Sequence, residues 1–294
     1  MDGGTVLAFV GFGEAAQAFA AAATQRSTVR AYDCKTDDPA TRVSKQADYS
    51  RFGLTGARDA ATALAGADGV LSLVTADQAR AAAEADSPFL EAGAFWFDCN
   101  SVAPETKRAA ARAIDAKGGR YVDVAILSPV YPLQNAVPLL VSGSHAAEAV
   151  VFLERVGFSN ARAVPGQLGA ASAIKMIRSV MVKGIEALTA ECVLAAHAAD
   201  VLDEVLTSLD ASEKAKSWRE RADYNLDRML IHGRRRAAEM YEVAQTLDSL
   251  GISPMMSKST VDWQQCMGDL EIASPEGLNA KLAAIAARRE ELGA

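Results

Sequence analysis

The sequence predicts an α/β fold in its first part and an all-α arrangement in the rest. Up to about residue 165, short β-branched or apolar runs alternate with alanine-rich stretches, which is typical of repeated strand–helix–strand units around a parallel sheet. After Gly166 the strand pattern stops and helical periodicity continues to the C-terminus. We therefore expect two domains, residues 1–165 and 166–294.

The individual elements follow from the same patterns. Strands are predicted over 5–10, 29–32, 69–74, 94–98, 121–126 and 139–142. Helices are predicted between them, over 14–24, 59–64, 77–84 and 104–117. One long helix is predicted from Gly169 to about His197, with later breaks near Asp210 and over 251–254.

The composition limits the classes of partner. A net charge of -7 leaves no excess of positive charge for a nucleic-acid backbone or an anionic membrane, so neither is expected. The N-terminal residues lack the basic start of a signal peptide, and no uncharged stretch is long enough to span a bilayer. The four cysteines and three histidines are scattered, without the spacing of a zinc site or disulfide framework. We expect a cytoplasmic protein that binds a small molecule and no metal.

The strongest local motif is G-x-G-x-x-A, which follows the first predicted strand and opens the first predicted helix. In a Rossmann domain the first glycine allows a tight turn, the second lets the backbone approach a pyrophosphate, and the small third residue lets the helix pack near the strand. The alternative is a glycine turn that binds nothing. The residues expected to contact a dinucleotide here are Gly11, Phe12, Gly13, Glu14, Ala15 and Ala16.

Asp33 lies at the end of the second predicted strand, 20 residues after Gly13. An acidic side chain at this place accepts hydrogen bonds from the adenosine ribose and repels a 2′-phosphate, which favours NAD. Because Lys35 lies nearby, NADP remains a second candidate cofactor. The structural alternative for Asp33 is that it caps a helix and contacts no ligand.

Polar residues also follow the third and fourth predicted strands. Ligands of open α/β sheets bind at the carboxyl ends of the strands, so these residues are candidates for contacts to the nicotinamide half of a dinucleotide. Capping of the following helices is an equally good explanation for each of them alone. The candidates are Val74, Thr75, Asn100 and Ser101.

Two further motifs carry a resemblance. They are D-x-x-S-x-x-P, with Asp98 and Ser101, and G-x-x-G-x-x-x-x-x-K, which ends at Lys175. Together with the glycine turn they resemble the β-hydroxyacid dehydrogenases, the superfamily of 6-phosphogluconate and 3-hydroxyisobutyrate dehydrogenases. The segment 232–263 is similar to a branch whose helical C-terminal domain has no settled function. The resemblance implies an NAD(P)-dependent oxidoreductase, with Lys175 as the general acid/base.

The surroundings of Lys175 suit this role. Its neighbours are apolar or small, and partial desolvation lowers the pKa of a lysine. Ser179 and Lys183 lie one and two helical turns further on. We expect Ser179 to be a second catalytic residue and Lys183 at most to contact substrate. A lysine that extends from a buried helix to solvent is the alternative.

The chain departs from its relatives at the substrate site. Ser179 stands where the hydroxyacid enzymes have asparagine, and their Ser-Gly-Gly loop corresponds here to a stiffer, more apolar segment that contains Ser128, Pro129 and Tyr131. We expect these three residues to bind substrate, and a substrate that is bulkier and less polar than a small hydroxyacid, aromatic rings included. Trp218, Tyr224, Trp263, Met255 and Met256 are candidates for a pocket wall, although burial in the helical core is the favoured interpretation.

Three functional hypotheses follow. The first is a dehydrogenase or reductase that acts on a CH–OH group and transfers hydride to nicotinamide. The second is a lyase on the same scaffold, which breaks a carbon–carbon bond beside a hydroxyl without net redox change. The third is a dinucleotide sensor without catalysis. A homodimer is expected, and the run Arg234 to Arg236 suits a solvated face or a subunit contact better than an anion site.

Overall fold

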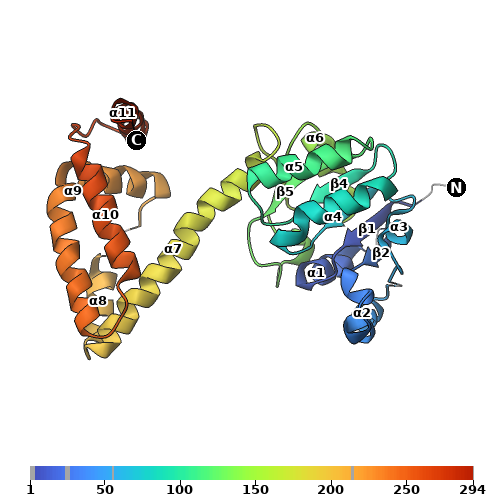
Figure 1. Ribbon diagram of the computed structural model, residues 1–294, viewed down its shortest axis with the longest axis horizontal. Helices are drawn as coiled ribbons and strands as arrows, with labels where there is room; N and C mark the ends of the chain where they lie inside the picture. Colours follow the sequence, from blue (N-terminus) through green and yellow to red (C-terminus); the bar gives the residue numbers. More distant parts are fainter. Residues whose placement is uncertain (1–3, 24–26, 55, 213–214, 294) are drawn as a thin grey trace. The chain divides into compact units, whose positions relative to one another are not determined.

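The computed structural model describes residues 4–23, 27–54, 56–212 and 215–293. The chain divides into two compact units, Met1–Val180 and Met181–Ala294. The division lies within the long helix α7 (Ala170–Ala198). The first unit is α/β and the second is helical, as the sequence predicts (Figure 1). The domain boundary at residue 165 stays a prediction.

One sheet organises the first unit. Its strand order is β2-β1-β3-β4-β5-β6-β7. Strands β1 to β5 run parallel, as the predicted strand–helix–strand units require, whereas β6 pairs antiparallel to β5 and parallel to β7. Within the described residues the strands are β1 (Val6–Val10), β2 (Thr28–Tyr32), β3 (Gly69–Ser72), β4 (Phe95–Asp98), β5 (Arg120–Ile126), β6 (Leu139–Ser142) and β7 (Ala161–Ala163).

Strand β7 and helix α2 (Pro39–Arg51) were not predicted. The strand has three residues and none of them is buried, so no apolar pattern marks it. The helix is polar along most of its length, although Asp38 accepts a hydrogen bond from the Ala40 amide and Pro39 occupies the first turn, which are ordinary start signals.

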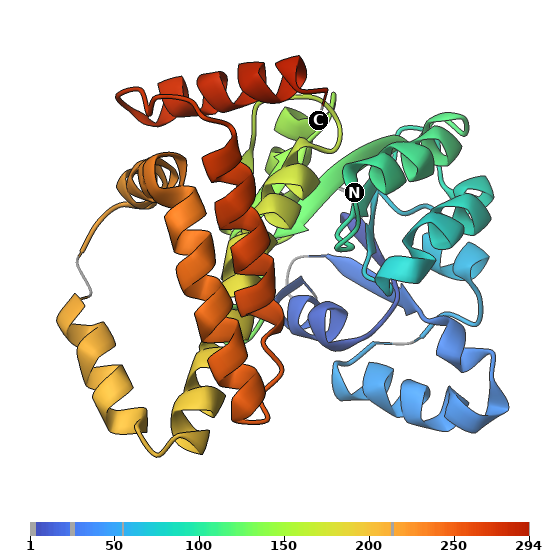
Figure 2. The same ribbon diagram turned by 60° about the vertical axis from the view of Figure 1, so that its left-hand side comes forward.

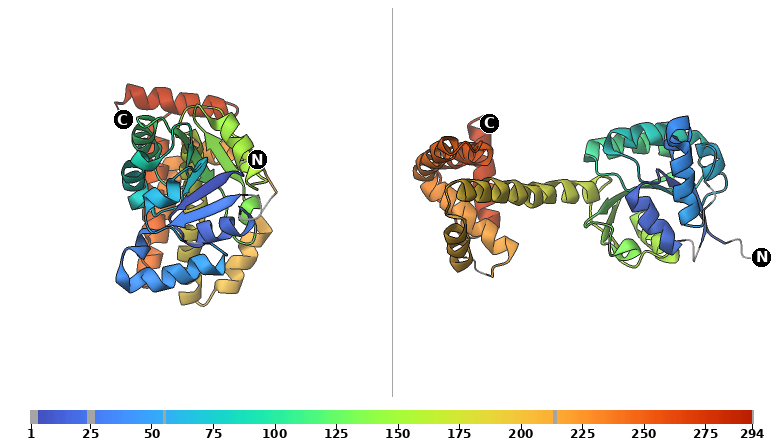
Figure 3. Two further views of the ribbon diagram at one scale, coloured as in Figure 1. Left: turned by 90° about the vertical axis from the view of Figure 1, so that its right-hand side faces the viewer. Right: turned by 90° about the horizontal axis from the view of Figure 1, so that it is seen from below.

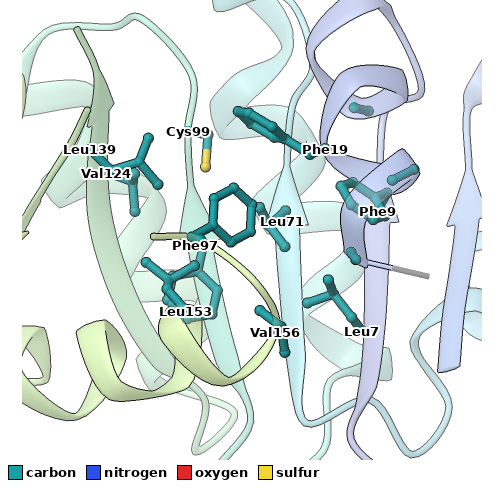
Figure 4. Packing of buried hydrophobic residues seen from close by; sticks show 14 of the residues in the cluster. Leu7, Phe9, Phe19, Leu71, Phe97, Cys99, Val124, Leu139, Leu153 and Val156 are labelled. Carbon is teal, nitrogen blue, oxygen red and sulfur yellow. The ribbon is translucent and has the colours of Figure 1, made fainter. Parts of the chain in front are cut away.

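Helices cover both faces of the sheet. Alternate residues of β1 point to opposite faces: Leu7 and Phe9 pack in one core and Ala8 and Val10 in the other. The first core, shown in Figure 4, joins α1 and α6 to the sheet. Besides α2 and the start of α7, the described α-helices of this unit are α1 (Glu14–Ala23), α3 (Ala60–Leu64), α4 (Ala79–Asp86), α5 (Pro104–Asp115) and α6 (Ala146–Arg155). Residue Thr24 of the first predicted helix lies outside the described residues.

The second unit is built around a helical hairpin. Helices α9 (Trp218–Ser249) and α10 (Met255–Asp269) pack side by side along much of their length (Figure 2). A Cβ built on Gly233 would lie 2.3 Å from the Gln264 carbonyl oxygen, so the two backbones are in contact at this crossing. The unit also holds the end of α7, together with α8 (Leu202–Ser212) and α11 (Leu278–Glu291). Figure 3 shows α7 as one continuous helix.

Four of the large side chains that the sequence analysis assigned to the core of this unit lie at its surface. Trp218, Tyr224, Met255 and Trp263 are exposed, so the interpretation favoured from the sequence is wrong for them. The small buried cluster consists instead of Leu230, Met267 and Leu270. None of the helices in the described part of the chain is long and apolar enough to cross a membrane.

Candidate active site

The sheet topology produces one crevice. Strand β1 lies between β2 and β3, so the chain leaves β1 towards one side for β2 and returns on the other side for β3. Parallel sheets bind ligands at such a point, beyond the carboxyl ends of the strands. A pocket of about 480 Å³ lies there, and it brings together the predicted site residues Glu14, Ala15, Val74, Asn100, Ser101, Ser128, Pro129 and Lys175.

The glycine turn has the geometry that its motif requires. Gly11 has a φ of +83°, and a Cβ at this residue would lie 2.6 Å from the Leu73 carbonyl oxygen. Only glycine fits both constraints without strain. A Cβ on Gly13 would meet nothing within 4 Å, so the space in front of its backbone is open. The turn therefore fits the pyrophosphate of a dinucleotide, which needs close approach to backbone amides at the start of a helix.

Asp33 stabilises this turn by a hydrogen bond to its backbone. Its carboxylate accepts hydrogen bonds from the Phe12 amide at 2.8 Å and from the Lys35 amide at 3.0 Å, and its side chain is only 12% exposed. The second bond caps the short helix over Cys34–Thr36, which is the structural alternative that the sequence left open. Contact of Asp33 with a ribose stays a prediction.

A buried lysine, Lys45, was missed by the sequence analysis. Its ammonium donates to the Phe12 carbonyl oxygen at 2.9 Å and lies 3.9 Å from the Asp33 carboxylate. The Phe12 ring packs against Tyr49 in the core, and Ala16 is fully buried at the helix–strand contact. The backbone of Phe12 therefore forms part of the turn, and its ring holds the turn in place by packing in the core.

Asn100 lines the pocket, and its side chain is fixed by two hydrogen bonds. Its side-chain amide donates to Ser72 Oγ at 3.0 Å and to Asp98 Oδ1 at 2.8 Å. Its Oδ1 atom is buried and has no hydrogen-bond partner among the described residues. Since a buried carbonyl oxygen is costly to leave unpaired, this atom is suited to accept a hydrogen bond from a bound ligand.

Lys175 approaches the pocket from α7. Its Nζ atom lies 2.5 Å from Ser101 Oγ, and the side chain is half-buried. Ser179 donates its hydroxyl to the Lys175 carbonyl oxygen at 2.9 Å and does not line the pocket. Lys183 is exposed and belongs to the second unit. The structure thus brings Lys175 into the pocket and leaves Ser179 outside its lining.

Of the remaining predicted residues, Ser128 lines the pocket, whereas Thr75 and Tyr131 do not. Thr75 precedes the short helix over Ala76–Gln78, and its hydroxyl lowers the pKa of the exposed Asp77 carboxyl by a hydrogen bond. Ser128 Oγ donates to the neighbouring Pro129 carbonyl oxygen at 3.3 Å. Tyr131 is exposed and is not among the lining residues.

A buried charged network supports the pocket, and the sequence analysis did not find it. Lys107 Nζ lies 2.9 Å from Asp98 Oδ1 and 3.5 Å from Asp123 Oδ1, and the side chains of all three residues are almost completely buried. Tyr121 donates its hydroxyl to Asp98 at 2.5 Å, and burial beside that carboxylate raises its pKa, so it remains a proton donor in this bond. Burial also raises the pKa of Cys99 to about 12, which keeps this pocket residue a thiol.

The same network holds the start of α7. Asp123 accepts from the Ser172 amide at 3.0 Å and from the Ser172 hydroxyl at 2.5 Å. Ser142, which donates to Asp123 at 2.9 Å, accepts from the Ala171 amide at 3.0 Å. These bonds satisfy amides of the first turn, which have no partner within the helix. No cluster of three or more His, Cys, Asp or Glu side chains in the described ranges could hold a metal ion.

Both parts of the chain match known protein families. Residues 6–156 match the family described as the NAD binding domain of 6-phosphogluconate dehydrogenase, and residues 196–267 match a family described as a domain of unknown function. The first match confirms the predicted resemblance and the predicted nicotinamide dinucleotide cofactor. The second covers most of the helical unit.

Three solved structures are similar over most of both chains. A conserved hypothetical protein from Sinorhizobium meliloti is 38% identical, with a TM-score of 0.61 over 97% of this chain and 96% of that one. A conserved protein of unknown function, described as similar to 3-hydroxyacid dehydrogenases, is 31% identical, with a TM-score of 0.58 over 90% and 97%. An imine reductase from Myxococcus stipitatus in complex with NADP+ is 16% identical, with a TM-score of 0.68 over 87% and 92%, and this likeness is one of fold.

Proposed function

The chain belongs to the family of the NAD binding domain of 6-phosphogluconate dehydrogenase, and from this membership we propose that it is an NAD(P)-dependent dehydrogenase or reductase with Lys175 as its general acid/base. The observation that carries the proposal is that Lys175 and the residues after the glycine turn line one pocket. When bound, the nicotinamide supplies hydride transfer, and a residue that moves a proton on the substrate oxygen completes the reaction.

Lys175 is suited to move that proton. Its ammonium donates a hydrogen bond to Ser101 Oγ at 2.5 Å, so the Lys175 side chain is held at the pocket before substrate binds. The helix that carries Lys175 is held through Ser172 and Asp123, which limits movement of the side chain relative to the pocket. Asn100 Oδ1 accepts a hydrogen bond from the bound ligand, and the Cys99 thiol takes no part as a nucleophile because its pKa is about 12.

The pocket favours a neutral, carbon-rich substrate. Leu73, Val74, Ile126 and Val130 contribute apolar side chains, while Lys175 is the single cation among the described lining residues. A substrate carboxylate would pair with Lys175 and hold it protonated, which opposes its use as a base. We therefore infer that the substrate is an alcohol or the corresponding carbonyl, or else an imine that is reduced to an amine, and that it is bulkier than a small hydroxyacid.

A lyase on the same scaffold is the second candidate. It is supported by the segment with Ser128 and Pro129, which lacks the two glycines of the usual substrate loop. In this reaction Lys175 removes a proton from a hydroxyl while the adjacent carbon–carbon bond breaks, and the resulting carbanion takes up a proton. Product would then form without net change in the nicotinamide.

The first test is calorimetric titration of the full chain with NADH and, separately, with NADPH. We propose that NADH binds more tightly, and that Asp33→Ala shifts the preference towards NADPH because the carboxylate that repels a 2′-phosphate is gone. Binding of neither dinucleotide would overturn the oxidoreductase proposal. A panel of alcohols, ketones and cyclic imines followed by nicotinamide absorbance then separates an oxidoreductase from a lyase, and a chain that binds NADH but acts on nothing would be a sensor.

A further inference from the structure

The three consecutive arginines of α9 have different partners. Arg234 forms ion pairs of 2.6 Å with both Asp269 and Glu271. Arg235 pairs with Glu239 at 2.8 Å. Arg236 forms no ion pair with any described residue, and its Nε atom is buried without a hydrogen-bond partner. One cation of this run is therefore left for a partner outside the described chain.

A second guanidinium lies beside it. Arg228 is two helical turns before Arg236 on the same helix, and it too forms no hydrogen bond or ion pair with the described residues. Both side chains line a pocket of about 360 Å³, with Asn225, Tyr224, Met229 and Gln264 as the remaining lining. No carboxylate belongs to this lining, so the two positive charges are not neutralised within it.

Gln264 is the buried polar group of the pocket. Gln264 is 7% exposed, and its Oε1 atom is buried and lacks a hydrogen-bond partner in the described part of the chain. Its position is set by the crossing of α9 and α10. Gly233 lies one turn before Arg236, and the backbone of Gln264 itself touches Gly233 there. The distance between the two helices at the pocket is therefore fixed by backbone contact.

We propose that this pocket binds a small molecule through an oxyanionic group, a phosphate or a carboxylate. A guanidinium donates two parallel hydrogen bonds to such a group, and two guanidiniums match its charge. The unpaired Gln264 Oε1 accepts a hydrogen bond from a hydroxyl of the same ligand, and Met229 and Tyr224 pack against its carbon part. The site lies wholly in the second unit and does not rest on the oxidoreductase proposal.

Titration of the full chain with inorganic phosphate, and separately with malonate, tests the proposal by calorimetry. The wild-type chain is expected to bind one equivalent of at least one of these probes, and the tighter of the two identifies the anion. Arg236→Gln is expected to weaken binding about tenfold or more, because a charged hydrogen bond to a buried group is lost. Arg235→Gln is the matched control: it removes the same charge from the next residue and leaves binding near wild type.

Absence of saturable binding of both probes to the wild-type chain would overturn the proposal. Equal binding by wild type, Arg236→Gln and Arg228→Gln would also overturn it, since the anion would then be held elsewhere, for example at the glycine turn. Circular dichroism establishes that each variant is folded, and Arg228→Gln carries the test if Arg236→Gln does not fold. A third outcome would also contradict the proposal: the chain forms a dimer that does not bind phosphate, and Arg236→Gln dissociates this dimer. An acidic side chain of a second copy would then fill the pocket.

Discussion

Ser172 donates both its amide and its hydroxyl to Asp123, over 3.0 and 2.5 Å. The carboxylate is buried beside Lys107, so the start of α7 is tied to a charged network inside the sheet rather than to a surface loop. Lys175 follows Ser172 by three residues. The position of the Lys175 ammonium therefore depends on a contact that never touches the pocket.

Ser172→Ala tests this dependence. Loss of the hydroxyl removes a hydrogen-bond donor from the buried Asp123 carboxylate and loosens the start of α7. The resulting small displacement of Lys175 should lower kcat by up to about 100-fold. The dissociation constant for NADH should stay near that of wild type, because Ser172 is outside the pocket lining. Steady-state kinetics and calorimetry measure the two quantities, with Ser44→Ala on α2 as a control. An unchanged kcat would exclude the positioning role.

Lys175→Met should abolish proton transfer but not cofactor binding. General acid/base catalysis contributes about 10²–10⁴-fold to a rate, and we expect kcat to fall by a factor in this range once a substrate is known. The exposed Lys117, which follows α5, provides the control, because Lys117→Met removes an equal charge outside the pocket lining. A variant at Lys175 with wild-type turnover would remove the central residue of the proposed function.

Gly11→Ala should lower stability, whereas Gly13→Ala should affect cofactor binding. An alanine at Gly11 must adopt a positive φ and meets the Leu73 carbonyl oxygen, so the free energy of unfolding should fall by about 1–3 kcal/mol. At Gly13 there is open space, and Gly13→Ala should leave unfolding nearly unchanged while weakening NADH binding tenfold or more. Urea denaturation and calorimetry separate the two effects. Equal NADH binding by Gly13→Ala and wild type would mean that the pyrophosphate lies elsewhere.

Asp86 predicts a pH dependence of stability. Burial raises the pKa of this carboxyl to about 6, above its ordinary value of 3.8. The folded state therefore binds the proton more tightly than the unfolded state, and stability falls as the pH rises from about 4 to about 6. Asp86→Asn should raise the free energy of unfolding at pH 8 by an amount on the order of 2–3 kcal/mol and change it little at pH 4. Denaturation curves at both pH values check this, and an equal effect at both would contradict it.

The exposed apolar row on α7 supports the expected homodimer. Ile174, Ile177, Met181, Ile185 and Leu188 recur at spacings of three or four residues and are all exposed in this chain. We expect the protein to sediment as a dimer and Ile177→Glu to shift it towards the monomer. Val43 on α2 is equally exposed but isolated, and Val43→Glu should leave the sedimentation coefficient unchanged. A wild-type monomer would refute this arrangement.

The strands could be predicted from the sequence because burial on both faces leaves an almost unbroken apolar run, as in β1 and β4. The direction of β6 could not be seen in such a run. A signal was nevertheless present in the connection, since 127–138 contains prolines and no predicted helix, whereas a parallel crossover usually includes one.

The polar interior was harder to predict. Lys45 and Lys107 each lie on a helix where a lysine is ordinarily exposed, and their partners Asp33, Asp98 and Asp123 come from other elements. Lys45 also pairs with Asp48 on its own helix at 3.0 Å, but no spacing within one helix marks the pairs between elements, because those contacts are made only when the sheet has assembled. Residues of the pocket were more predictable, since the ends of parallel strands meet at one edge whatever their side chains.

The anchor at Ser172 also limits how the chain can change in length. An α-helix turns through about 100° per residue, so Ser172 and Lys175 point in related directions only while two residues separate them. A single insertion between them would rotate Lys175 to another side of α7 and move it about 1.5 Å along the axis. The stretch between Ser172 and Lys175 therefore tolerates substitutions but not insertions or deletions. Sequences of proteins that keep this arrangement should align here without gaps.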